Sequence, residues 1–158
     1  MKLPLILNPS SNFLVKKVSV TTDVQICLAI RHQVFVERQK VPINEEVDGL
    51  DFSSEHYLLF LDQLPVGTAR VRCIEDFAKI ERVAILEAHQ KQGLGYVLMN
   101  SVIEDIKQNH RVNKAKLGAQ VYAIPFYEKL GFVVCSNEYL DAGIPHKDMQ
   151  FKYSMNTS

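Results

Sequence analysis

Residues 79–95 read KIERVAILEAHQKQGLG and carry the clearest structural signal in the chain. The run from Ile80 to Leu86 is largely apolar and rich in β-branched residues, which predicts a buried strand. A polar turn then leads through QKQGLG, residues 90–95, into a stretch with helical periodicity. This order predicts a strand, a glycine-containing loop and a helix N-terminus.

Such a junction is suited to binding an anion. The first backbone N–H groups of a helix have no partner within the helix, and the helix dipole adds partial positive charge there. Glycine at positions 93 and 95 would let a phosphate approach the main chain closely, because glycine has no Cβ. A Walker loop needs Lys-Ser or Lys-Thr at its end, and a dinucleotide fingerprint needs a small residue where Leu98 stands, so neither motif matches. The hexapeptide alone leaves an ordinary strand-to-helix turn equally open.

Length and composition favour one globular domain, residues 1–158, with a core at about 17–153 and mobile ends. Hydrophobic residues make up 47% of the chain and charged residues 23%. Lysine plus arginine equals aspartate plus glutamate at 18 each, so no overall field attracts nucleic acid or an anionic membrane. We therefore expect neither partner.

The apolar piece Leu3–Leu7 is too short for a secretory signal, and no later stretch approaches the length of a membrane span. These features predict a cytoplasmic protein. The three cysteines, Cys27, Cys73 and Cys135, are odd in number and far apart, which indicates neither a disulfide framework nor a zinc site. We expect all three to be small core residues, and we expect no metal.

The remaining patterns predict an α+β (mixed α/β) fold. A Ser/Thr-x-x-Glu/Gln capping box at 22–25 predicts a helix through about Glu37, and a second amphipathic helix should run to about Asn109. The predicted strands lie at 16–21, 56–61, 66–74, 80–86, 116–121, 132–135 and 149–153, with a further short helix at 122–130. The sheet should be mixed but mostly antiparallel, with about seven strands and about four helices.

The connection from Gln39 to Ser54 is long and acidic, and it contains Glu45, Glu46, Asp48 and Asp51. Loops of this length are often functional lids. A solvated loop with one turn of helix is the alternative, because acidic clusters usually face water. The sequence leaves both interpretations open.

A second motif decides the family. Residues 118–132 read GAQVYAIPFYEKLGF, and the part Ala-x-x-Phe-Tyr-Glu-Lys-Leu-Gly-Phe follows QKQGLG at a fitting distance. Together these motifs resemble the GCN5-related N-acetyltransferase superfamily, whose pyrophosphate loop reads Gln/Arg-x-x-Gly-x-Gly/Ala. Residues 34–42 and 139–149 are similar to a small bacterial subgroup of uncharacterised acetyltransferases. One departure is Gln120, where the family usually has Asn, although a Gln amide can still hydrogen-bond across the cleft.

The resemblance implies transfer of an acetyl group from acetyl-CoA to a primary amine by direct attack in a ternary complex. Backbone groups of Val83, Ala84 and Ile85 would pair with the pantetheine, and an N–H of the same strand would stabilise the oxyanion. Gln120 and Tyr127 would also border the cofactor. Tyr127 would protonate the departing thiolate, with a merely packing tyrosine as the alternative. The pyrophosphate would lie on the loop formed by Gln90, Lys91, Gln92, Gly93, Leu94 and Gly95.

The base that deprotonates the amine is less clear from the sequence. Glu81 on the central strand is the first candidate and Glu46 the second, while His146 is a third because imidazole titrates near ~6.5. We expect Glu46, Asp48 and His146 to border the acceptor, and the acidic loop would favour a cationic amine. The other four histidines have no partner spacing for a metal or a nucleophile.

A second class of function is a sensor that binds acyl-CoA without turnover, since fold alone does not guarantee activity. The presence of Tyr127 argues against this alternative. The sequence does not identify the amine acceptor, and it leaves open whether the chain is a monomer or a homodimer.

Overall fold

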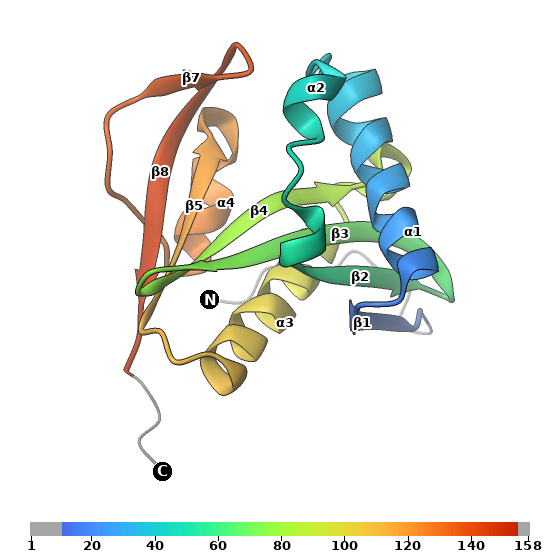
Figure 1. The fold of residues 1–158 in the computed structure, drawn as a ribbon, viewed down its shortest axis with the longest axis horizontal. Coiled ribbons are helices and arrows are strands. Elements are labelled where there is room, and N and C mark those ends of the chain that lie inside the picture. Colours follow the sequence, from blue (N-terminus) through green and yellow to red (C-terminus); the bar gives the residue numbers. More distant parts are fainter. Residues whose placement is uncertain (1–10, 155–158) are drawn as a thin grey trace.

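The computed structural model describes residues 11–154. The predictions for Leu3–Leu7 and for mobile ends concern residues outside this range. The chain forms one mixed sheet with helices on both faces (Figure 1). Within the described residues, no helix is long and apolar enough to cross a membrane.

The strands are β1 (Phe13–Val18), β2 (Glu55–Leu61), β3 (Leu64–Ile74), β4 (Phe77–Ile85), β5 (Lys114–Gln120), β6 (Val133–Val134), β7 (Tyr139–Asp141) and β8 (Ile144–Lys152). The α-helices are α1 (Thr21–Arg31), α2 (Ile43–Glu46), α3 (Leu94–Asn109) and α4 (Ile124–Lys129), and a π-helical segment at His32–Arg38 continues α1. Along the chain, β1 is followed by α1 and α2, then by the consecutive strands β2 to β4, by α3, β5 and α4, and last by β6 to β8.

The sheet has the order β1-β2-β3-β4-β5-β8-β6, with β7 paired to β8. All neighbours are antiparallel except β4 and β5, which are parallel because α3 connects them as a crossover. The predicted mixed, mostly antiparallel sheet with four helices is therefore confirmed. The structure has eight strands where about seven were expected.

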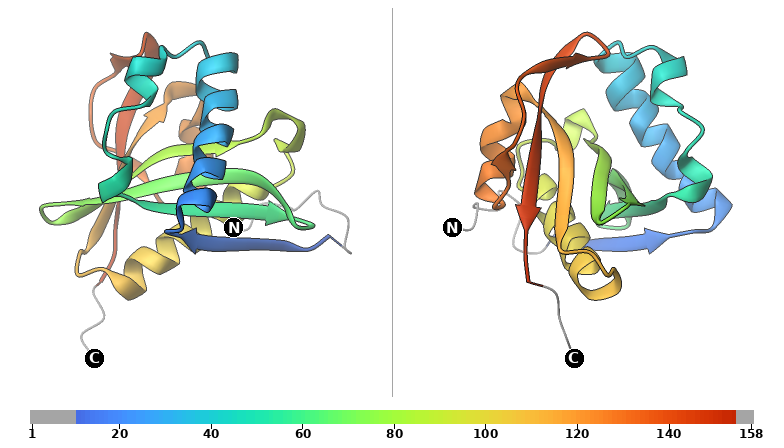
Figure 2. Two further views of the ribbon diagram at one scale, coloured as in Figure 1. Left: turned by 45° about the vertical axis from the view of Figure 1, so that its right-hand side comes forward. Right: turned by 60° about the vertical axis from the view of Figure 1, so that its left-hand side comes forward.

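The helices bury their apolar stripes on opposite faces of the sheet (Figure 2). Leu94, Leu98, Val102 and Ile106 of α3 step by four residues, and each is at most 1% exposed against one face. On the other face, α1 packs against the sheet through residues that include Cys27 and Ile30. Adjacent residues of β2 point to opposite faces, so a single strand supplies both cores.

Several local predictions were wrong. Helix α1 begins at Thr21 with Val20 as its N-cap and no side-chain cap hydrogen bond, so the predicted capping box does not form. The segment before β8 contains a strand that we did not predict, β7, which pairs with β8 through a turn at Ala142 and Gly143. Both turn residues have positive φ, as a two-residue hairpin turn requires.

The cysteines also differ from the prediction of three core residues. Cys27 is buried, whereas Cys73 and Cys135 are exposed. Cys73 lies within β3, opposite Ala78 of β4, so a place in a paired strand does not by itself bury the side chain. Cys135 directly follows the short strand β6.

Strands β4 and β5 separate soon after they meet, and this separation positions the site. They pair only at Ala78 with Ala115 and at Lys79 with Lys116, although β4 continues to Ile85. A β-bulge lies just beyond the paired part: Arg82 has a φ of 55°, and the register with β3 shifts there. Bulges bend a strand and leave backbone groups outside the ladder, so the two strands diverge.

Candidate active site

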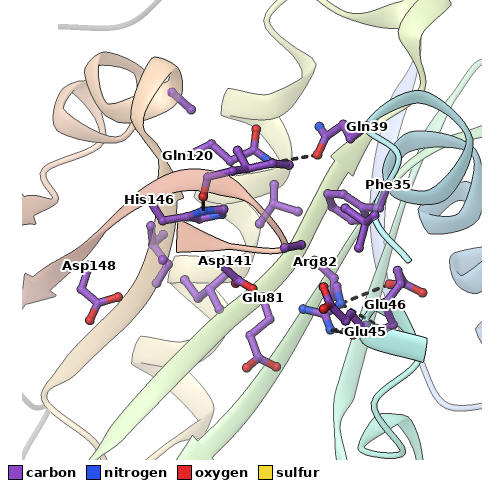
Figure 3. Close-up of a pocket in the computed structure, with 18 of the residues that line it drawn as sticks. Phe35, Gln39, Glu45, Glu46, Glu81, Arg82, Gln120, Asp141, His146 and Asp148 are labelled. Carbon is purple, nitrogen blue, oxygen red and sulfur yellow. Dashed lines mark hydrogen bonds and ion pairs between the residues drawn. The ribbon is translucent and has the colours of Figure 1, made fainter. Parts of the chain in front are cut away.

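A cavity of about 240 Å³ lies between the diverging strands (Figure 3). It is bordered by β4 and β5, by the π-helical segment after α1 and by the β7–β8 hairpin. Six of the predicted site residues line it: Glu46, Glu81, Val83, Gln120, Tyr127 and His146. Asp48, Ala84, Ile85 and the loop at 90–95 do not line this cavity.

Tyr127 reaches the cavity from α4. Its ring meets Phe126 edge-on with centroids 5.0 Å apart and Phe132 with centroids 6.0 Å apart, so aromatic packing fixes its direction. Burial raises the pKa of the Tyr127 hydroxyl above its usual value. The group therefore stays protonated at neutral pH, as a proton donor must.

His146 lies on β8, opposite Gln120 of β5 in the register, and is 8% exposed. Its Nδ1 is 2.6 Å from the carbonyl oxygen of Ile144. A carbonyl oxygen can only accept, so Nδ1 carries a proton, and in the neutral ring Nε2 is then the nitrogen with the lone pair. The ring also stacks on Tyr139 with centroids 5.9 Å apart, which fixes its plane.

Glu81 is held by two arginines. Its carboxylate accepts hydrogen bonds from Arg70 at 2.6 Å and from Arg72 at 2.7 Å. Although burial alone would raise the pKa of this carboxyl, the two guanidinium groups outweigh it and lower the pKa to about 2. A carboxylate with so little affinity for protons is a poor base, which argues against our first candidate.

The acidic connection is docked on the sheet, and three of its four carboxylates, Glu46, Asp48 and Asp51, are paired with arginines. Glu46 is 4% exposed and accepts a 2.7 Å hydrogen bond from Arg31, while Arg82 approaches the same oxygen at 3.1 Å. Both terminal nitrogens of Arg70 donate hydrogen bonds to the Asp48 carboxylate, at 2.8 and 2.9 Å, and this contact lowers the pKa of Asp48. The one turn of helix expected in this connection is present as α2, but Glu46 and Asp48 are bound by arginines and are not left to meet an amine.

Other carboxylates of the cavity remain available. Glu45 and Asp141 line it, and within residues 11–154 neither side chain forms an ion pair. Asp148 also lines it and accepts a hydrogen bond from the Tyr139 hydroxyl at 2.5 Å. Of the acids expected on this side of the cleft, Glu45 therefore remains available, and Asp141 is a further one that the sequence did not indicate.

The loop before α3 has the expected backbone. Gly93 is the N-cap of α3 and has a φ of 84°, in the left-handed region that favours glycine. The Gln90 side chain donates a 2.8 Å hydrogen bond to the carbonyl of Ile85, which ties the loop to the end of β4. Leu94 is 1% exposed, so its side chain belongs to the core and only its backbone can contact a ligand.

These features fit acetyl-CoA. The 16-residue helix α3 presents its N-terminal backbone N–H groups beside two glycines, a suitable place for a pyrophosphate. Residues Val83–Ile85 of β4 lie beyond the part of the strand that pairs with β5, so this edge can pair with an extended ligand. Gln120 donates to the side chain of Gln39 at 2.8 Å, so its amide does hydrogen-bond across the cavity.

The sequence reasoning missed the arginines. Arg70 and Arg72 alternate on β3, and Arg70 is 1% exposed within a largely apolar strand. A buried arginine demands carboxylate partners, which was the available signal for an ion-pair network. Gln39 carried no such signal, because its partner Gln120 lies 81 residues away in the sequence.

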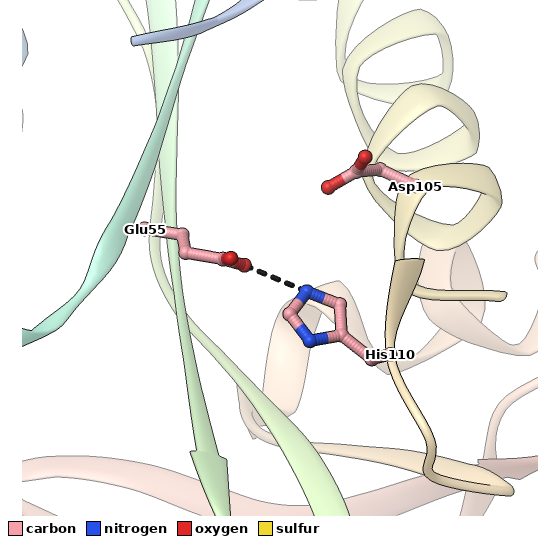
Figure 4. Close-up of side chains that lie close together, drawn as sticks. All are labelled: Glu55, Asp105 and His110. Carbon is pink, nitrogen blue, oxygen red and sulfur yellow. Dashed lines mark hydrogen bonds and ion pairs between the residues drawn. The ribbon is translucent and has the colours of Figure 1, made fainter. Parts of the chain in front are cut away.

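One group of side chains outside the cavity has the composition of a metal site. Ligand atoms of Glu55, Asp105 and His110 lie within 4.8 Å of one another (Figure 4). The Lys17 ammonium lies 3.1 Å from Glu55 and 3.0 Å from Asp105, so the chain itself supplies the positive charge between the carboxylates. We do not interpret this group as a metal centre.

Known proteins share this architecture. An acyl-CoA N-acyltransferase from Pseudomonas aeruginosa superposes with a TM-score of 0.79 at 28% identity over 90% of this chain and 99% of that one. An acetyltransferase from Elizabethkingia anophelis, crystallised with acetyl-CoA bound, has the same fold at a TM-score of 0.69 and 19% identity, covering 89% of this chain and 98% of that one. The chain thus has the fold of an acyl-CoA N-acyltransferase.

The sequence comparisons define the family. Residues 21–153 match the model of the acetyltransferase (GNAT) domain. The N-acetyltransferase YjcF of Bacillus subtilis is 40% identical over 121 residues, which cover 76% of this chain and 86% of that protein. The chain therefore belongs to the GNAT family and is an acyl-CoA-dependent N-acetyltransferase.

Proposed function

We propose that this protein transfers an acetyl group from acetyl-CoA to a primary amine by direct attack within a ternary complex. The observation that carries the proposal is one cavity lined by both a protonated hydroxyl, Tyr127, and a lone-pair nitrogen, His146 Nε2. An acyl transfer to an amine needs both groups, because the amine must lose a proton and the leaving thiolate must gain one.

His146 replaces Glu81 as the proposed base. Its tautomer is set by the Ile144 carbonyl, so Nε2 can accept a proton from the attacking amine without any rearrangement. Glu81 would instead keep Arg70 and Arg72 in place beneath the cavity. Glu46, our second candidate, suits this role less well, because its carboxylate already accepts hydrogen bonds from Arg31 and Arg82.

Tyr127 is proposed to give its proton to the departing thiolate. The backbone around the bulge at Arg82 lies outside the β3–β4 ladder, so the N–H of Val83 is a candidate donor to the developing oxyanion. The loop from Gln90 to Gly95 would hold the pyrophosphate through its backbone. When bound, acetyl-CoA supplies the acyl group as a thioester.

The preferred acceptor is proposed to carry a second positive charge. Glu45 and Asp141 lie on the cavity wall without ion-pair partners among the described residues, and carboxylates there attract and orient a cation. Polyamines and basic peptides have this charge pattern. This acceptor class follows from the free carboxylates, not from Glu46 and Asp48.

The proposal is tested by single variants in an assay of CoA release across a panel of amines. Tyr127→Phe and His146→Gln should each lower kcat by ~10²–10⁴-fold while the affinity for acetyl-CoA stays within twofold. His32→Gln serves as the matched control, since the His32 side chain is 45% exposed and its one ionic contact within residues 11–154 is a 3.8 Å approach to Glu37.

Two outcomes would contradict the proposal. Wild-type turnover in either variant would remove that residue from the mechanism. Binding of acetyl-CoA with no CoA release for any amine would instead indicate the acyl-CoA sensor. In that case the same cavity would bind ligand without supporting chemistry.

A further inference from the structure

A second group of reactive side chains lies outside the cavity, at the junction of β3 and the end of α3. Cys73 is exposed near the end of β3, and its Sγ lies 3.3 Å from Nδ1 of His110, the residue that follows α3. Nε2 of the same imidazole lies 2.8 Å from a carboxylate oxygen of Glu55 on β2, as Figure 4 shows. None of the three residues lines the cavity.

The hydrogen bonds fix a direction for proton movement. An ionised carboxylate only accepts, so Nε2 of His110 carries a proton and donates a hydrogen bond to Glu55. Nδ1 is then the acceptor for the Cys73 S–H. A nucleophile bonded to a base, with the base oriented by a carboxylate, is the arrangement that activates cysteine in enzymes.

Lys17 holds this arrangement in place. Its ammonium lies 3.1 Å from Oε1 of Glu55, the oxygen that His110 does not use, and 3.0 Å from Asp105. Asp105 in turn accepts hydrogen bonds from the hydroxyl of Tyr57 and from Asn109. Side chains from β1, β2 and α3 therefore keep Glu55 directed at the imidazole.

We propose that Cys73 is a modification site that forms a mixed disulfide with low-molecular-weight disulfides such as oxidised glutathione. Sγ of Cys73 would attack one sulfur of the disulfide as its proton passes to Nδ1 of His110. A new S–S bond forms, the original S–S bond breaks, and the other half leaves as a thiolate that takes the proton from His110. The disulfide is the oxidant and is itself reduced to one thiol.

The charges around Cys73 decide how this thiol reacts. Partial burial and the Glu55 carboxylate raise the pKa of the Cys73 thiol, whereas Lys17 lowers it, and Tyr153 also lies close enough to interact. A free thiolate is thus disfavoured at rest. The proton would pass to His110 as the thiol attacks, because Nδ1 already accepts the S–H hydrogen bond and Glu55 contacts the same ring through Nε2.

The chain provides its own control. Cys135 is exposed as well, but within residues 11–154 its thiol has no histidine partner. The purified protein would be treated with oxidised glutathione at pH 7, and modification of Cys73 and Cys135 would be followed over time by peptide mass spectrometry. Cys73 should react at least ~10-fold faster, and this advantage should shrink above the ordinary thiol pKa of ~8.5, where neither thiol needs a base.

Two variants test the assigned groups. His110→Gln should reduce the rate at Cys73 to that of Cys135 at pH 7, and Glu55→Gln should reduce it by a smaller factor, with Cys135 unchanged in both. If one variant fails to fold, the other provides the measurement, and the wild-type ratio of the two rates is informative by itself. Equal rates at Cys73 and Cys135 in the wild type, or an unaltered rate after His110→Gln, would overturn the proposal.

Discussion

Replacing Glu81 by glutamine separates a structural role from a catalytic one. The pKa of Glu81 falls from 4.5 to about 2 on folding, and its side chain is 9% exposed, so little solvent screens the contact. At about 1.4 kcal/mol per pKa unit, the carboxylate contributes about 3 kcal/mol to the free energy of unfolding at pH 7. Glutamine keeps the size of the side chain but removes this charge from Arg70 and Arg72.

The contribution of Glu81 must depend on pH in one direction. Because the pKa is lower in the folded state, the stabilisation is complete above about pH 5 and disappears as the pH falls toward 2. At pH 3 the difference between wild type and Glu81→Gln should therefore shrink to about 1 kcal/mol. Arg70 keeps its contacts with Asp48 and Asp51 in the variant, so we expect the protein to fold.

Urea unfolding of both proteins at pH 7 and pH 3 measures this difference. Glu104→Gln is the control, because Glu104 is 62% exposed and meets Lys107 only at 3.8 Å, so its replacement should change stability by less than about 0.5 kcal/mol. A stability unchanged at pH 7, together with a loss of kcat above ~100-fold, would refute our reasoning. Glu81 would then be the base after all.

Three further variants probe the rest of the site. Gly93→Val should abolish measurable acetyl-CoA affinity in calorimetry, because valine is strained at a φ of 84° and obstructs the N-terminus of α3; unchanged affinity would contradict the loop assignment. Glu45→Gln combined with Asp141→Asn should raise the KM for a diamine about 10-fold and make that KM less dependent on salt, while the KM for acetyl-CoA stays constant. An unaltered KM for the diamine would show that these acids do not bind the acceptor. Arg82→Lys should lower kcat by a larger factor than it changes the KM of acetyl-CoA or of the amine, since lysine keeps the charge but loses the guanidinium fork that holds the bulge. Equal effects on kcat and KM would point to a role in binding instead.

The sequence predicted those features of the fold that depend on residues close together in the chain. The β-branched run before the glycine loop, the four-residue periodicity of α3 and the glycine at its N-cap each depend on neighbouring residues, and each was predicted correctly. Strand β7 was not predicted, because its three residues are all exposed and so show no hydrophobic alternation. The predicted capping box does not form because α1 starts two residues earlier than the motif requires, with Val20 in place of Thr22 as the N-cap.

The electrostatic part of the site could not be predicted from local patterns. Glu46 meets an arginine 15 residues earlier and another 36 residues later, and no spacing rule connects such positions. His146 could be named as a candidate, but its usable nitrogen became clear only from the Ile144 carbonyl. Burial and pairing are tertiary properties, and they determine which of several carboxylates is free to act.

The ion pairs explain why an acidic loop beside a cleft need not bind the substrate. Arg82 has a positive φ at the bulge of β4, and its guanidinium donates to the Glu46 carbonyl at 3.1 Å and to the Glu45 carbonyl at 3.2 Å. Residues 45–48 thus hold β4 in place through Arg82, close to the point where β4 separates from β5. Without those bonds, a strained residue in the middle of β4 could relax toward the regular ladder, and the strands would approach each other. Residues 45–48 accordingly brace β4 beside the cleft, and under the proposed function the acceptor is recognised by Glu45 and Asp141, whose carboxylates have no ion-pair partner among the described residues.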